Sequence, residues 1–278
     1  MPDPTRRVER KAWRAGGLVA GERMIPEEAA VAFTYNGSSY AVMMATPQDL
    51  EDFALGFSLT EGIVKSATEV ESLEIIEEEL GVELRMRLTE PHATTFRDRR
   101  RFLAGPTGCG LCGIESLGEA MRSPGVISDD STFAPKDIMA ALDALHGLQT
   151  INQTTRAVHA AAFYRQGEGI VALREDVGRH NALDKLAGAL ARKGIDGHGG
   201  FGLLTSRLSV ELVQKAAAVG IPMLAAVSAP TALAVRTAET AGITLIGIAR
   251  NDGFEIFTHP QRIKEERNVQ ERNKHVLA

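Results

Sequence analysis

Cys109 and Cys112 are the only cysteines of the 278-residue chain, and two residues separate them. Four glycines and a proline lie around them within residues 105–113, a composition that indicates a loop. The thiolate is the reactive form of cysteine, and a neighbouring thiol or positive charge lowers the pKa of a thiol. Four arginines at 97–101 could supply that charge. Such a pair could accept sulfane sulfur from a persulfide donor, hold it as a persulfide and pass it on.

The spacing of these cysteines is compatible with two other kinds of site. A C-x-x-C pair can be half of a zinc site, which needs two further ligands, or a dithiol–disulfide couple. Spacing alone does not choose among the three. A zinc deaminase is disfavoured, because its mechanism needs a Glu two residues after a His ligand and a proline directly before the C-x-x-C. None of the seven histidines has a Glu at that position, and Gly108 precedes Cys109.

The second half of the chain alternates strand and helix patterns. Apolar runs predict strands over 201–205, 221–227 and 243–249, and amphipathic patterns predict helices over 209–219 and 231–241. Glycines follow both helices as stop signals. Two further strands are predicted at 159–164 and 170–174, and we expect them to pair with each other. This alternation predicts an α/β fold whose sheet is mostly parallel and covered by helices.

Polar connections follow three of these strands. They are Thr205-Ser206-Arg207-Leu208-Ser209, Ser228-Ala229-Pro230-Thr231 and Arg250-Asn251-Asp252-Gly253. Ligands of such sheets bind at the carboxyl ends of the strands, and the first two connections lead into helix N-termini, which suit an anion. Arg207 and Arg250 could add phosphate contacts. Any single Ser or Thr here could simply cap a helix, but three connections together favour a phosphate-bearing ligand.

The run Asp176-Val177-Gly178-Arg179-His180-Asn181-Ala182-Leu183-Asp184-Lys185 gathers polar side chains at the start of a helix. One interpretation is ligand contact, with His180 as a proton carrier near neutral pH. The other is a capped helix with surface ion pairs, which contribute little energy. Spacing alone leaves the two evenly balanced.

The first half reads as a smaller α+β part. Alternating apolar residues around Asn36-Gly37 predict a β-hairpin over 31–44, and Thr46 is positioned to cap a helix that follows. Val82 to Leu88 alternate with charged residues, as in a half-buried strand.

Charge and hydropathy exclude several classes of protein. With 31 basic and 36 acidic residues, the net charge of −5 argues against a general nucleic-acid binder. Residues 216–235 carry no charge, but prolines and polar residues interrupt them as in a buried strand followed by a helix, so we expect no membrane span. The basic N-terminus lacks the apolar stretch of a secretory signal, and we expect a cytoplasmic protein.

Several motifs together resemble the formate dehydrogenase accessory sulfurtransferases, the FdhD family, from about Glu28 to Arg262. The matching stretches include Cys109-Gly110-Leu111-Cys112-Gly113, the whole Asp176–Lys185 run, Thr205-Ser206-Arg207, the stretch Ala225-Ala226-Val227-Ser228-Ala229-Pro230-Thr231, and Thr258-His259-Pro260-Gln261-Arg262. Members of this family take sulfur from a cysteine desulfurase and deliver it to the molybdenum or tungsten bis-guanine-dinucleotide cofactor that formate dehydrogenase needs.

The resemblance implies roles for residues of this chain. Cys109 would carry the persulfide, with Cys112 assisting, and no permanently held metal is expected. The cofactor-binding segment of the family matches Ile248-Ala249-Arg250-Asn251-Asp252-Gly253, one of the three polar strand ends. We expect Thr205, Ser206, Arg207, Ser228 and His180 to complete the cofactor site. The family also implies a cytidine deaminase-like α/β layer and a homodimer.

These observations predict four segments. They are a flexible N-terminal tail over 1–25, an α+β part over 26–115 that ends in the cysteine loop, an α/β cofactor-binding domain over 116–262, and a charged C-terminal tail over 263–278. One departure from the family concerns His159, which follows Arg156-Ala157-Val158 instead of a glycine-rich stretch, so a histidine satisfied inside the core is expected there. Two other functions remain open, a non-catalytic cofactor-binding chaperone and a zinc-stabilised binding module.

Overall fold

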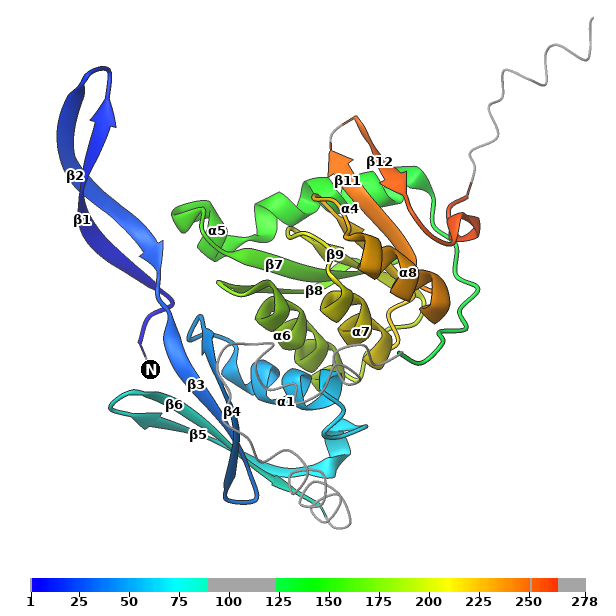
Figure 1. The fold of residues 1–278 in the computed structure, drawn as a ribbon, viewed down its shortest axis with the longest axis horizontal. Coiled ribbons are helices and arrows are strands. Elements are labelled where there is room, and N and C mark those ends of the chain that lie inside the picture. Colours follow the sequence, from blue (N-terminus) through cyan, green and yellow to red (C-terminus); the bar gives the residue numbers. More distant parts are fainter. Residues whose placement is uncertain (1, 90–123, 251, 265–278) are drawn as a thin grey trace, which may run out of the picture.

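The computed structural model describes residues 2–89, 124–250 and 252–264. Two sheets with helices between them form the body, and a long hairpin stands away from it (Figure 1). The N-terminal elements are β1 (Thr5–Arg14), β2 (Gly17–Pro26), β3 (Ala29–Tyr35), β4 (Ser38–Ala45), α1 (Leu50–Thr60), β5 (Val70–Glu78) and β6 (Gly81–Leu88). The C-terminal elements are α4 (Pro135–Leu148), α5 (Thr150–Thr155), β7 (His159–Arg165), β8 (Gly169–Asp176), α6 (Arg179–Arg192), β9 (Gly200–Leu204), α7 (Val210–Ala218), β10 (Met223–Ala226), α8 (Ala232–Ala241), β11 (Thr244–Arg250) and β12 (Gly253–Ile256).

The six-stranded C-terminal sheet is mixed. Its order is β12-β11-β10-β9-β7-β8, and only the pairs β9–β10 and β10–β11 are parallel. The pairs β7–β8, β7–β9 and β11–β12 are antiparallel. The expected α/β layer is confirmed, but the expectation of a mostly parallel sheet is wrong, because short turns rather than crossover helices connect β7 to β8 and β11 to β12.

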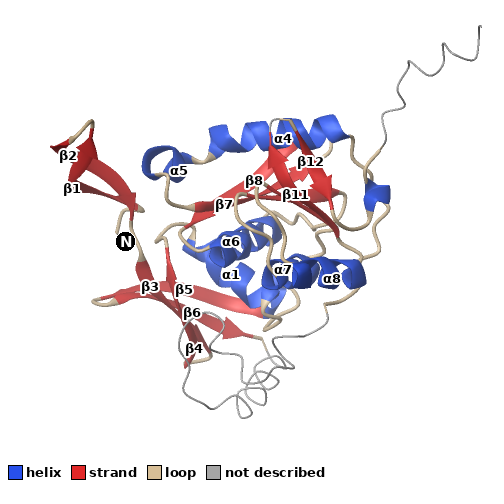
Figure 2. Cartoon of the chain, turned by 45° about the horizontal axis from the view of Figure 1, so that its top comes forward, coloured by secondary structure: helices blue, strands red, loops and turns tan. Residues whose placement is uncertain are grey.

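Helices cover both faces of this sheet. The helices α6, α7 and α8 pack on one face, where leucines such as Leu186 and Leu212 join the largest apolar core. Helix α4 packs on the other face through Ile138 and Leu145. Figure 2 shows α4 on one side of the strands and α6, α7 and α8 on the other. The strand at 221–227 and the start of the helix at 231–241 are therefore core elements, as expected. No helix in the described ranges is long and apolar enough to cross a membrane.

The N-terminal part has its own four-stranded sheet, of order β4-β3-β6-β5. The predicted hairpin is confirmed as β3 and β4, with Asn36 and Gly37 at φ of 49° and 75°, the left-handed values that a tight hairpin turn requires. Helix α1 covers the inner face through Phe53 and Phe57. The expected cap of this helix is wrong, because α1 begins at Leu50 with Asp49 as its N-cap.

The expectation of a flexible tail over residues 1–25 is also wrong. Strands β1 and β2 pair in antiparallel fashion from Thr5–Pro26 to Arg14–Gly17. At the base, Arg23 donates a hydrogen bond of 2.9 Å to the backbone oxygen of Thr155, which fastens the hairpin to α5.

Helices α1 and α6 join the two parts at very short range. A Cβ added to Gly188 of α6 would overlap the backbone oxygen of Asp52, and one added to Gly56 of α1 would overlap the backbone oxygen of Asp184. The two helix backbones can approach this closely only because both positions lack a side chain. This contact fixes the N-terminal sheet and α1 against the C-terminal layer.

We expect Gly188→Ala to lower the free energy of unfolding by about 3 kcal/mol or more, since the new methyl group meets backbone and forces the helices apart. Chemical denaturation followed by circular dichroism measures the change. Gly147→Ala in α4 is the matched control, because no heavy atom lies within 4 Å of the added Cβ. That variant should gain up to about 1 kcal/mol from the better helix former. Equal stabilities of Gly188→Ala and wild type would contradict the close crossing.

Candidate functional site

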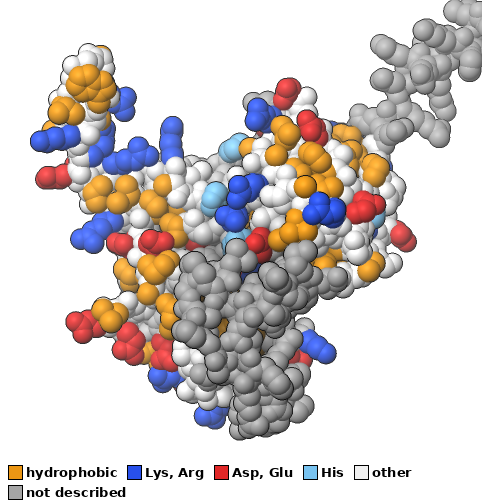
Figure 3. Space-filling model, viewed as in Figure 1, with side chains coloured by type: hydrophobic (Ala, Val, Ile, Leu, Met, Phe, Trp, Pro, Cys, Tyr) orange, Lys and Arg blue, Asp and Glu red, His pale blue; other side chains and the backbone are white. Residues whose placement is uncertain are grey.

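The polar connections predicted from the sequence meet at one edge of the C-terminal sheet. Backbone hydrogen bonds hold them side by side, from Val227 N to Leu204 O at 3.1 Å, from Thr231 N to Leu208 O at 2.9 Å and from Ile248 N to Ser228 O at 3.3 Å. Since β7 runs antiparallel to β9, the start of β7 and the end of β8 lie at this same edge. Figure 3 shows histidine and basic side chains close together in the middle of this face.

This edge therefore brings together the predicted cofactor residues that the structure describes. They are His180 at the start of α6, Thr205, Ser206 and Arg207 after β9, Ser228 after β10, Ile248, Ala249 and Arg250 at the end of β11, and Asp252 and Gly253 at the start of β12. Asn251 lies outside the described residues. The geometry agrees with a shared site, while the binding role of each residue stays a prediction.

The end of β11 is conformationally strained. Ile248 has a φ of 52°, a left-handed value that is unfavourable for a β-branched residue. The pairing of β11 with β12 shifts register between Gly247 and Arg250. A Cβ on Gly247 would lie 2.9 Å from Cδ of Pro230, so the connection between β10 and α8 packs tightly against this position. Strain of this kind persists where the surrounding structure enforces it, and it is concentrated at functional sites.

Some of the hydroxyl groups at this edge have structural roles. Thr205 Oγ1 accepts a hydrogen bond of 2.8 Å from Ala160 N of β7. Thr231 caps α8, because its Oγ1 accepts from Ala234 N at 3.2 Å. Arg207 and Arg250 are both exposed at the edge. The capping interpretation is therefore confirmed for Thr231, whereas Thr205 bonds to the backbone of β7 instead, and the arginines are the groups that could reach a ligand.

The Asp176–Lys185 run joins the two parts of the chain instead of lying on the surface. Asp176 and Lys185 form a fully buried ion pair of 2.6 Å. Lys185 Nζ also donates to Thr46 O at 2.8 Å, and Asp176 Oδ2 accepts from Thr46 N at 3.0 Å. Asn181 donates to both Asp176 Oδ1 and Met44 O, each at 2.9 Å. Surface ion pairs are thus the wrong interpretation of these residues, which are buried where β4 meets α6.

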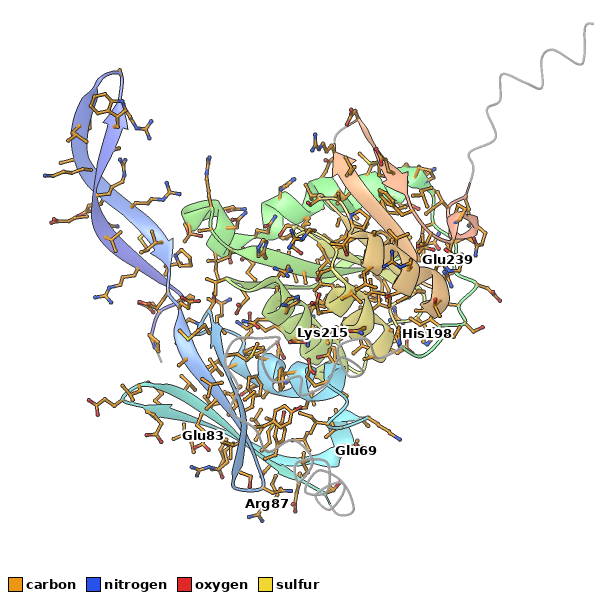
Figure 4. The ribbon with its side chains drawn as sticks, in the orientation of Figure 1. Glu69, Glu83, Arg87, His198, Lys215 and Glu239 are labelled. Atoms are coloured by element: carbon orange, nitrogen blue, oxygen red, sulfur yellow. The ribbon has the colours of Figure 1, made fainter. Side chains whose placement is uncertain are left out.

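A second buried charge cluster lies where α1, α6 and α7 meet. Lys215 Nζ, labelled in Figure 4, contacts Asp184 Oδ1 at 2.9 Å and Glu61 Oε1 at 2.6 Å. Thr60 Oγ1 donates to Asp184 Oδ1 at 2.6 Å. Burial raises the pKa of Asp184 to about 6, although the Lys215 charge opposes this. Burial would lower the pKa of Lys215, but the charges of Asp184 and Glu61 raise it, so the amine stays protonated.

This raised pKa predicts a pH dependence of stability. Between about pH 4 and 6 the folded protein keeps a proton on Asp184 that the unfolded chain has released, so this contribution favours folding at low pH and is lost as pH rises. Asp184→Asn removes the titrating group. We expect the free energy of unfolding of Asp184→Asn to improve relative to wild type from pH 4 to pH 7, measured by urea denaturation at each pH. A relative stability that stays constant or falls would contradict this assignment.

Four polar atoms at the starts of α6 and α7 are buried and have no hydrogen-bond partner in the described part of the chain. They are Arg179 Nε, His180 Nε2, Ser209 Oγ and Glu211 Oε2. His180 Nε2 and Glu211 Oε2 face each other at 3.9 Å, beyond hydrogen-bond distance. Burial lowers the pKa of His180 to about 4, and the charges of Arg179 and Lys215 act in the same direction. This lowered pKa does not favour the predicted role of His180 as a proton carrier near neutral pH, and that role stays a prediction.

His159 also belongs to this edge. It begins β7 opposite Asp176 and is half-buried, so it does not lie inside the core as expected. Burial lowers the pKa of His159, and the Arg179 charge adds to this effect. Arg179 and Ser209 belong to the polar segments that the sequence analysis considers for ligand contact, whereas Glu211 was not among the predicted residues. The signal for Glu211 is its position in the first turn of α7, which follows a strand end.

Cys109 and Cys112 lie outside the described residues, so their role stays a prediction. The segment boundaries near residues 115 and 262 also stay predictions. Among the described residues no group of three or more His, Cys, Asp or Glu side chains is arranged to hold a metal ion.

Comparison with known proteins agrees with the resemblance found in the sequence. The model of the FdhD/NarQ family matches residues 26–264. A protein of Agrobacterium fabrum named sulfur carrier protein FdhD is 55% identical over 259 residues, which cover 93% of this chain and 96% of that protein. A protein of the same name from Brucella abortus is 52% identical over 262 residues, covering 94% and 97%.

A crystal structure shares the fold. It is of a candidate formate dehydrogenase accessory protein from Desulfotalea psychrophila and superimposes with a TM-score of 0.75 at 23% identity, covering 94% of this chain and 99% of that one. At this identity the similarity concerns the fold alone. Because the family model spans most of the sequence and the two relatives share more than half of the aligned residues, the chain belongs to the FdhD/NarQ family.

Proposed function

We propose that this chain is a sulfurtransferase that carries sulfur, as a persulfide on Cys109, from a cysteine desulfurase to the molybdenum or tungsten bis-guanine-dinucleotide cofactor of a formate dehydrogenase. Membership of the family is the observation that carries this proposal, since the relatives at 55% and 52% identity are sulfur carrier proteins. The motif Cys109-Gly110-Leu111-Cys112 supplies the thiols that such a carrier requires.

The first step is a thiol exchange. The Cys109 thiolate attacks the terminal sulfur of the donor persulfide, the donor's S–S bond breaks, and the donor leaves as a thiolate while a persulfide forms on Cys109. Delivery of this sulfur to a metal as sulfide requires two electrons, and oxidation of Cys109 and Cys112 to a disulfide supplies them. This assigns Cys112 the assisting role that the resemblance implies.

The edge of the C-terminal sheet supports a role in holding the cofactor, which is a substrate here. Arg207 after β9 and Arg250 at the end of β11 are exposed on either side of the connection that follows β10, and α8 has no acidic residue in its first turn. Phosphate groups bind well to such helix starts and to arginines. The strained Ile248 marks the same place.

The remaining parts of the proposal follow from family membership. We infer a cytoplasmic homodimer that meets both a cysteine desulfurase and a formate dehydrogenase, with a C-terminal layer like that of cytidine deaminases. A non-catalytic chaperone that binds the cofactor and hands it over is the second candidate, because the sheet edge alone could serve that function.

Intact mass spectrometry separates the two candidates. The protein is incubated with a cysteine desulfurase and cysteine, and wild type is compared with Cys109→Ala and Cys112→Ala. We expect a reductant-sensitive gain of about 32 Da, one sulfur atom, that only Cys109→Ala loses. If no variant gains sulfur while the cofactor still binds, the chaperone function replaces this proposal.

A further inference from the structure

The β1–β2 hairpin presents apolar side chains to solvent at its tip. Trp13 and Leu18, which lie opposite each other on the two strands, are 71% and 69% exposed, and Val19 is 53% exposed. The bond from Arg23 to Thr155 O holds the base, and the rest of the hairpin stands away from the body (Figure 1). A two-stranded hairpin is only marginally stable by itself in water, so an arm with strands of 10 residues indicates a surface that a partner covers.

The hairpin is also a basic part of an acidic chain. Residues 5–26 contain six basic and two acidic side chains, a net charge of +4, whereas the whole chain has −5 and its remainder therefore −9. Arg7 pairs with Glu22 across the strands at 3.0 Å, but Lys11 and Arg14 are exposed and have no ion pair with any residue that the structure describes. An arm with uncompensated positive charge attracts an acidic partner surface.

Strand β5 of the same chain has the complementary pattern. Residues 69–79 contain six glutamates and neither lysine nor arginine. In the described part of the chain β5 pairs with β6 alone, so its other edge is open to a further strand. Glutamates on an open edge repel a second copy of that edge but favour a basic strand. Figure 3 shows basic side chains along the hairpin and acidic ones at the left end of the N-terminal sheet.

The hairpin and β5 are kept apart within one chain. Both Figure 1 and Figure 2 show the hairpin extending away from the β5 and β6 strands of its own chain. A second copy of the chain can supply the acidic strand to each hairpin. A two-fold axis would repeat the contact, because each copy has one hairpin and one β5 edge.

Strands β1 and β5 match in length and in the order of their side chains. They have 10 and 9 residues, and each runs from charged residues towards an exposed apolar residue near a turn. If β1 lies parallel to β5, three complementary pairs fall on one side of the combined sheet, because side chains two or four residues apart on a strand share a face. These pairs are Arg7 with Glu74, Lys11 with Glu78, and Trp13 with Leu80, which is 90% exposed.

We propose that β1 of one copy adds to the open edge of β5 in a second copy, so that two chains exchange their hairpins. Backbone hydrogen bonds between the strands hold the arm, and the charge pairs and the apolar tip set its register. The inference goes beyond the proposed function, which includes a homodimer but names neither of the surfaces that form it.

Charge reversal tests the pairing. Sedimentation of the full chain over a range of concentrations measures the dissociation constant of the dimer. Arg7→Glu with Lys11→Glu opposes like charges in two pairs, and Glu74→Lys with Glu78→Lys does so from the other side. We expect each set to raise the dissociation constant at least about 100-fold, and the four substitutions together to return it to within about 10-fold of wild type. Lys193→Glu, on the exposed end of α6, is the matched control and should leave it unchanged.

Trp13 gives a second measurement, because it is the only tryptophan of the chain. Its emission should shift to shorter wavelength as the dimer forms, and back on dilution or at about 1 M salt, which screens the charge pairs. Circular dichroism establishes that every variant is folded. Vesicles of phosphatidylglycerol are added to the dilute protein as a separate arm. A shift caused by these vesicles and not by protein concentration would make the hairpin a lipid-binding element and overturn the inference.

The remaining outcomes decide whether the proposed surfaces form the dimer. A chain that stays monomeric up to about 100 µM overturns the inference. So does a dimer whose dissociation constant is the same in both charge-reversed sets, since it must use other surfaces, or a folded four-substitution variant that fails to dimerise. Loss in each set with recovery in the combination supports the exchange of hairpins. Sulfur loading of Cys109 is measured separately by mass, so the proposed function can stand when this inference fails.

Discussion

Cys109→Ala is expected to lower formate dehydrogenase activity in cells to the level found when this chain is deleted. Alanine cannot form a persulfide, so no sulfur can pass from the desulfurase to the cofactor, however well the cofactor binds. The measurement is formate oxidation in extracts of a deletion strain that expresses either wild type or the variant at equal abundance. A chaperone would not need either thiol, so full activation by Cys109→Ala would contradict the sulfur-carrier function.

Two controls make the loss specific. The free energy of unfolding of Cys109→Ala should equal that of wild type, because alanine is well tolerated in a glycine-rich loop. Cys112→Ala should still gain sulfur in the mass measurement, since Cys109 alone receives it. In cells, Cys112→Ala should retain partial activity if a small thiol can supply the electrons that Cys112 normally gives. Equal and complete loss from both variants would instead make the two cysteines one functional unit.

Much of the α/β layer could be predicted because its signals are local. Glycines after α7 and α8 and the apolar runs of β9, β10 and β11 determined element type and place within a few residues. Strand direction has no local signal, and the antiparallel β7 and β12 made the sheet mixed. The β1–β2 hairpin was missed because its turn is Ala15-Gly16, with Ala15 at a φ of 46°, a value that alanine rarely adopts.

The sequence likewise predicts some features of the candidate site and not others. The polar strand ends could be predicted, since the carboxyl ends of neighbouring parallel strands must meet at one edge. The close approach of His180 and Glu211 could not be predicted, because it brings together the first turns of two helices whose first residues are 31 positions apart in sequence. The roles of Asp176 and Lys185 also depend on Thr46, a residue from the other part of the chain. Sequence spacing contains no information on such long-range partners.

Lys185→Met is expected to lower the free energy of unfolding by about 3–5 kcal/mol, because it leaves Asp176 as a buried charge without its counter-ion. Methionine matches the length of lysine, so lost packing contributes little. The variant also removes the hydrogen bond to Thr46 O that joins α6 to the end of β4. Urea denaturation followed by circular dichroism measures the stability.

The control lies near the other end of the same helix, at Lys193, which is exposed and donates a single hydrogen bond of 2.8 Å to Val171 O. Lys193→Met should change the stability by no more than about 0.5 kcal/mol, as for other surface substitutions. The contrast isolates burial, since both variants replace the same residue type with the same side chain. Adding Asp176→Asn to Lys185→Met should recover part of the loss, because it removes the stranded charge while the amide oxygen can still accept the hydrogen bond from Gly178 N. If Asp176→Asn destabilises the Lys185→Met variant as much as it destabilises wild type, then the hydrogen bonds of Asp176, rather than its charge, dominate this junction.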